Sequence, residues 1–174
     1  MGLKYKFKKA NQIIAKLSDI DLKRLDKISH EIEMAQDDLL KKGQPVFKKC
    51  KNQCKGLCCR NLEIDMVISL WDFVYILARE DSFRYPISKA LEKENIFHSS
   101  NCIFLENGVG PCIFPPNSLP EVCVTSFCNS EPIIRKEIRL VKYKFVKLWW
   151  FFFTRKYRVI QDRLFNSDLD QVIK

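Results

Sequence analysis

The chain has 174 residues, 47% of them hydrophobic, so one ordinary domain can bury a core without disulfides to compensate for a small one. Its net charge of +9 is unevenly distributed: residues 1–60 carry 15 Lys and Arg against 7 Asp and Glu, residues 61–130 carry 4 against 9, and residues 131–174 carry 11 against 5. The N-terminus has no secretory signal pattern and no apolar run approaches the ~20 residues of a spanning helix, which predicts a cytoplasmic protein.

Three helices are expected in the first half of the chain. Apolar residues recur with a period near 3.6 over residues 10–42, which predicts one long amphipathic helix that stops at Gly43. His30 on this helix has no second ligand nearby in sequence, and we interpret it as structural. Residues 65–80 predict a second helix with Ser69 as a possible N-cap, and residues 86–94 a short third one.

The next segment, NCIFLENGVGPCIFPP at residues 101–116, predicts a β-hairpin. Two short apolar runs flank Asn107-Gly108, a typical turn dipeptide. If Glu106, Asn107 and Gly108 form a three-residue loop, Cys102 and Cys112 lie opposite each other.

The segment after residue 131 is rich in basic and aromatic residues. Its length without turn residues exceeds that of ordinary strands, so it predicts a helix despite its β-prone aromatics. The fold class expected is α+β and mainly α. It comprises a basic helical segment at residues 1–45, a small cysteine-rich metal-binding domain with a β-hairpin at residues 46–130, and a basic aromatic helix at residues 131–174.

Sulfur is the most distinctive chemical feature of the sequence. The stretch CKNQCKGLCC places four thiols in ten residues, and four more follow. In a reducing compartment such clusters are more often metal ligands or redox groups than structural bridges. Thiolates suit zinc, iron or an iron–sulfur cluster, in one site or two. The candidate ligands are Cys50, Cys54, Cys58, Cys59, Cys102, Cys112, Cys123 and Cys128.

The order of these cysteines resembles the YkgJ-like cysteine-cluster family, a zinc- or iron-chelating domain with a CxxCxxCC signature. The family's later elements have counterparts in CIFL from Cys102, CIF from Cys112 and LPEVCVTSFC ending at Cys128. The resemblance covers residues 46–130 and implies a metal site, without implying a reaction. Each gap in the first cluster is one residue wider than in the signature, and the family's Arg-Pro is Leu119-Pro120 here.

Several functions are compatible with such a site. The first is a metal-binding protein that coordinates zinc or iron, and the alternatives are an iron–sulfur electron-transfer protein or a metal-dependent accessory enzyme. Whether the protein is an enzyme stays open. His98, four residues before Cys102, is a candidate ligand or base, with a loop histidine as the favoured interpretation. Asp72 resembles an aspartate of the family, with a solvated helix carboxylate as the simpler interpretation.

The aromatic run FVKLWWFFFTRKYR near the C-terminus bears on partners. Trp and Phe beside Lys and Arg suit a membrane surface or a protein partner, with single-stranded nucleic acid ranked last. The favoured interpretation is that the helix packs back on the N-terminal helix, with some aromatic surface left for peripheral membrane contact.

Overall fold

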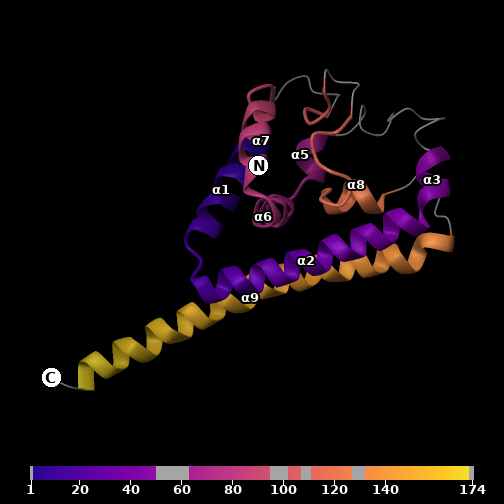
Figure 1. Cartoon of the computed structure of the whole chain (residues 1–174). Helices are drawn as coiled ribbons and strands as arrows, with labels where there is room; N and C mark the ends of the chain where they lie inside the picture. The colour runs from indigo at the N-terminus through magenta and orange to yellow at the C-terminus, as the bar shows by residue number, and fades with distance from the viewer. Residues whose placement is uncertain (1, 50–62, 95–101, 107–110, 127–131, 173–174) are drawn as a thin grey trace.

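The computed structural model describes residues 2–49, 63–94, 102–106, 111–126 and 132–172, with side chains up to Arg155, and this part of the chain is all-α (Figure 1). The helices are α1 (Leu3–Ala15), α2 (Asp19–Lys42), α3 (Gln44–Lys49), α5 (Ile64–Val67), α6 (Leu70–Arg79), α7 (Arg84–Leu91), α8 (Glu121–Thr125) and α9 (Arg135–Val172), with short 3₁₀ turns at Asp81–Phe83 and Pro132–Ile134. None of the helices in these ranges is long and apolar enough to cross a membrane.

The N-terminal segment forms two helices, so the prediction of one continuous helix over residues 10–42 is wrong. α1 begins earlier, at Leu3, and α2 begins after Ser18, whose Oγ accepts a hydrogen bond from the Asp21 N–H at 3.2 Å. This side-chain cap satisfies an N–H that a new helix would otherwise leave without an acceptor. Leu17, between the two helices, is buried and anchors the bend in the core.

The helix predicted at residues 65–80 is divided in the same way, into α5 and α6, and the cap expected at Ser69 is confirmed. Ser69 and Asp72 form a reciprocal capping box, in which the Asp72 carboxylate accepts the Ser69 N–H at 2.7 Å and Ser69 Oγ accepts the Asp72 N–H at 3.2 Å. α6 then runs through the centre of the core, where Phe73 to Leu77 are all buried. The third predicted helix is confirmed as α7, shifted by two to three residues.

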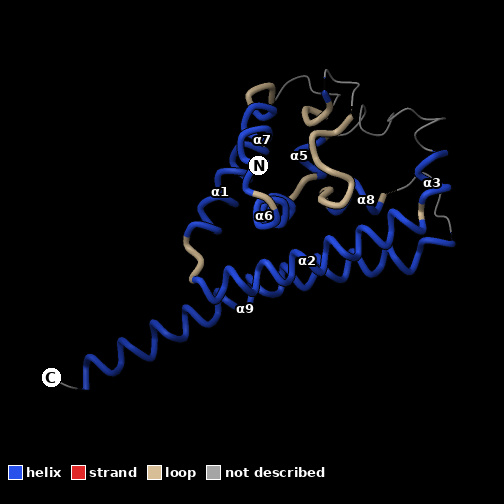
Figure 2. The backbone as a smooth tube through the Cα atoms, viewed as in Figure 1, coloured by secondary structure: helices blue, strands red, loops and turns tan. Residues whose placement is uncertain are grey.

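The predicted β-hairpin is not present in the described residues, so the fold class is all-α and not α+β. The segments 102–106 and 111–126 meet at one isolated antiparallel bridge, Leu105 with Cys112, and otherwise run as loops apart from α8 (Figure 2). Pro111 has no N–H to donate, and a turn brings the Leu105 N–H to the Cys102 carbonyl at 3.2 Å. Together they prevent a longer ladder on the described part of either arm.

The long helices α2 and α9 lie side by side and run antiparallel, which confirms both the C-terminal helix and its packing against the N-terminal segment (Figure 1). Four ion pairs at three places fix this alignment along the pair: Asp21 with Arg155, Glu31 with Lys144 and Lys147, and Lys42 with Glu137. Between them α9 buries an apolar face that contacts α6 as well, through the ring pairs Tyr75–Phe145 and Trp71–Phe152. α8 contacts α9 as well, and α1, α5, α6 and α7 lie above the α2–α9 pair in the view of Figure 1.

Candidate metal centre

Three of the eight candidate thiols, those of Cys102, Cys112 and Cys123, lie in the part of the chain that the structure describes. The other five predicted ligands lie outside the described residues, as does His98; they are Cys50, Cys54, Cys58, Cys59 and Cys128. Cys102 is buried, Cys112 is half-buried and Cys123 is exposed.

Cys102 and Cys112 come together through one turn and one backbone bridge. Cys102 begins the turn that ends at Leu105, and Leu105 pairs with Cys112. A turn of this kind spans less than about 7 Å between Cα atoms and an antiparallel pair about 5 Å, so the two cysteines lie within about 12 Å of each other. The predicted direct opposition of Cys102 and Cys112 is wrong, because the residue opposite Cys112 is Leu105.

Aromatic packing anchors this pair of segments to the core. Phe104 is completely buried, with its ring centroid 4.9 Å from that of Phe114 and 6.3 Å from that of Phe73 on α6. The Phe104 carbonyl accepts the Ile113 N–H at 2.9 Å. Phe104 is two residues from Cys102 and is hydrogen-bonded to the residue after Cys112, so burial of its ring helps to hold both backbones in place.

The loop that leads from Cys112 to α8 is fixed by buried polar side chains. Gln36 of α2 donates to the Leu119 carbonyl at 2.8 Å and accepts the Leu119 N–H at 3.0 Å, so its amide satisfies both groups of one peptide position. The Tyr75 hydroxyl donates to the Asn117 carbonyl at 2.9 Å, and burial raises the pKa of this phenol. The loop is therefore hydrogen-bonded to α2 at Leu119 and to α6 at Asn117.

Asp72 sets the start of α8, the helix that carries Cys123. One carboxylate oxygen accepts the Ser69 N–H and hydroxyl, at 2.7 and 2.6 Å, and the other accepts the Glu121 N–H at 2.7 Å. The interpretation of Asp72 as a solvated carboxylate is therefore wrong. Burial raises the pKa of this carboxyl, and the hydrogen bonds from Ser69 and Glu121 oppose that rise. Its oxygens are occupied by N–H and O–H donors, which makes it a positioning residue and not a candidate ligand.

The described donors do not make a metal site by themselves. Within the described ranges, no group of three or more His, Cys, Asp or Glu side chains is arranged to hold a metal ion. A four-thiolate site that includes Cys102, Cys112 or Cys123 therefore needs thiols from residues 50–62 or 127–131, which the sequence places directly before α5 and directly after α8. His30 lies exposed on α2, with its Nδ1 3.3 Å from a carboxylate oxygen of Glu33.

Gln36, Tyr75 and Asp72 hold the backbone around the described cysteines, and the sequence pattern did not identify them in this role. Each is a polar residue on the apolar side of a helix, and such a position is the one signal that could have identified it.

Comparison of the chain with known protein families, with curated proteins and with solved structures finds no match.

Proposed function

We propose that the protein binds zinc or iron, as single ions or as an iron–sulfur cluster, through its clustered cysteine thiolates. The candidate ligands are the eight cysteines, and thiolate is the ligand that zinc and iron–sulfur centres share. The observation that carries the proposal is that the backbone around Cys102, Cys112 and Cys123 is fastened to the core by ring packing and hydrogen bonds, because ligands held in advance lose little freedom when a metal binds.

Two supports of different origin hold these cysteines. The Cys102 and Cys112 segments are fixed by the buried ring of Phe104, and the helix of Cys123 is fixed by the Asp72 carboxylate. A buried Cys102 alone is also consistent with a small apolar core residue. Cys123 is exposed on α8, so burial in the core does not account for a cysteine at this position.

Anaerobic purification followed by elemental analysis and absorption spectroscopy tests the proposal directly. We expect zinc or iron in stoichiometric amount, with visible absorption for an iron–sulfur centre and none for zinc. Cys58→Ser and Cys59→Ser should lower metal content and soluble yield, because metal ligation can contribute on the order of 10 kcal/mol to folding.

Cys123→Ser separates ligation from packing. Because this side chain is exposed, the substitution should change the stability of metal-free protein by less than about 0.5 kcal/mol, while it lowers metal content and the stability of metal-loaded protein. Ser126→Ala, at the exposed C-terminal end of α8, is the matched control and should leave metal content unchanged. Metal-free wild-type protein with undiminished stability would refute the proposal.

A further inference from the structure

The helix α9 carries apolar side chains on two different faces. One face, which includes Val141, Leu148 and Phe152, is buried against α2 and α6. The opposite face is exposed, and we call it the outer face of α9. It consists of the apolar and aromatic residues Tyr143, Val146, Trp149, Trp150 and Phe153 together with the basic residues Arg135, Lys136, Arg139 and Lys142.

Helix geometry places these nine residues on one side of α9. At ~100° per residue eight of them fall on the half of the circumference that faces away from Val141, and Trp149 lies at the border of that half. Trp150 is 55% exposed and Tyr143 is 62% exposed, values that are high for such large rings. The rings of Trp149 and Trp150 each stack on that of Phe153, with centroid distances of 5.0 and 5.5 Å, so the three form one continuous aromatic surface.

The charge of the outer face is entirely basic. Between Arg135 and Arg155 the sequence has one carboxylate, Glu137, and it is buried and paired with Lys42 at 2.6 Å. Among the described residues, acidic side chains of other elements lie beside this face in two hollows, which residues of the face also line. One hollow of about 400 Å³ includes Asp38, and one of about 370 Å³ includes Glu121. A partner that complements such a face carries anionic groups on its surface and apolar groups beneath them.

We infer that the outer face of α9 binds the surface of an anionic lipid membrane, with the helix parallel to the bilayer. Residues 135–153 extend over about 27 Å at 1.5 Å per residue, which gives a long line of contact. Tyrosine and tryptophan favour the boundary between headgroups and acyl chains, and the neighbouring lysines and arginines contact acidic headgroups. This inference concerns α9 alone and does not depend on metal binding.

The position of α9 in the molecule favours a flat partner. α9 lies along one edge of the fold (Figure 1), where it contacts α2, α6 and α8, while Tyr143 and Trp150 on its outer face stay exposed. A planar surface can therefore contact the outer face along its length. Single-stranded nucleic acid binds aromatic residues by stacking of bases on ring faces, but the faces of Trp149 and Phe153 are stacked on each other.

Vesicle sedimentation provides the test. The full-length protein should sediment with vesicles of phosphatidylcholine and phosphatidylserine, much less with phosphatidylcholine alone, and the binding should weaken as salt is raised. Each basic side chain near an anionic surface contributes about fivefold to binding, so Arg139→Gln with Lys142→Gln should weaken it by about 25-fold. Trp150→Ala should weaken it severalfold and reduce the blue shift of tryptophan fluorescence on binding.

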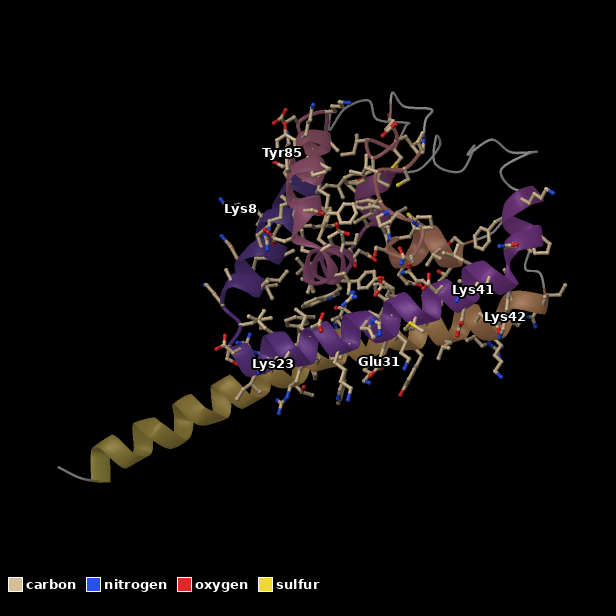
Figure 3. All side chains as sticks on the ribbon, viewed as in Figure 1. Lys8, Lys23, Glu31, Lys41, Lys42 and Tyr85 are labelled. Carbon is tan, nitrogen blue, oxygen red and sulfur yellow. The ribbon has the colours of Figure 1, made fainter. Side chains whose placement is uncertain are left out.

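Matched controls come from the far side of the molecule. Lys8→Gln with Lys9→Gln removes the same charge from α1, and Tyr85→Ala removes an aromatic ring that is 74% exposed on α7 (Figure 3). Both should bind vesicles as the wild type does. The inference is overturned if the protein ignores acidic vesicles, if the controls weaken binding equally, or if the outer face instead mediates self-association or binds an acidic polypeptide or single-stranded DNA more tightly than vesicles.

Discussion

Replacement of Asp72 by asparagine should destabilise the protein far more than an ordinary surface change. The carboxylate accepts three hydrogen bonds at 2.6 to 2.7 Å in a buried position, two from Ser69 and one from the Glu121 N–H. Asparagine is nearly the same size but has only one oxygen, so its NH₂ group must face either Ser69 or Glu121. One buried backbone N–H then loses its acceptor, which costs about 1–3 kcal/mol.

The remaining hydrogen bonds also lose their charge assistance, which brings the expected loss in free energy of unfolding to about 2–4 kcal/mol. Urea unfolding followed by far-ultraviolet circular dichroism measures this quantity. Asp19→Asn, an exposed carboxylate in the first turn of α2, is the matched control and should cost about 0.3–1 kcal/mol. If Asp72→Asn costs no more than the control, the coupling of α6 to α8 through this side chain is wrong.

Two further predictions concern the pairing of α2 with α9. Leu148→Ala should lower the free energy of unfolding by about 2–5 kcal/mol because the side chain is completely buried, whereas Val146→Ala on the outer face should change it by less than about 0.5 kcal/mol; equal effects in urea unfolding would contradict the assigned faces. The hydrogen bonds from two lysines of α9 lower the pKa of Glu31 from 4.5 to about 2, so its stabilisation, about 1 kcal/mol for a partly exposed pair, is present above pH 4.5 and is lost as the pH falls towards 2. Stabilities of the wild type and of Glu31→Gln, measured against pH, should therefore converge over that interval, and a constant difference would exclude this origin.

The helices were predictable where a single face repeats over several turns. The periodicity of α2 and the length of α9 both indicated helices, because burial of one face is a property of local sequence spacing. The break at Ser18 was missed although Ser-Asp-Ile-Asp is a recognisable N-cap pattern, because the apolar period continues across it. In the same way the Asn-Gly signal indicated a hairpin, but the proline at Pro111 and the turn at Cys102 limit the described pairing to one bridge.

The candidate site was less predictable than the fold. Cysteine spacing identifies candidate ligands but does not determine the distances between their thiols. Those distances depend on loops, and side chains from other helices set the positions of the loops. The Asp72 carboxylate illustrates this dependence, because its burial follows from α8, which begins 49 residues later in the chain. Gln36 contacts Leu119 across 83 residues for the same reason. Contacts over such separations leave no local pattern in the sequence.

The antiparallel pairing of α2 with α9 also bears on the order in which the chain can fold during its synthesis. Glu31 meets Lys144 across 113 residues and Asp21 meets Arg155 across 134. Until the ribosome has released α9, the apolar side of α2 has no α9 to cover it, and the intervening cysteines emerge while the fold is incomplete. The cysteine-rich segment is therefore synthesised before α2 and α9 can pair. During that interval reducing conditions and chaperones protect the exposed thiols and apolar side chains from oxidation and aggregation.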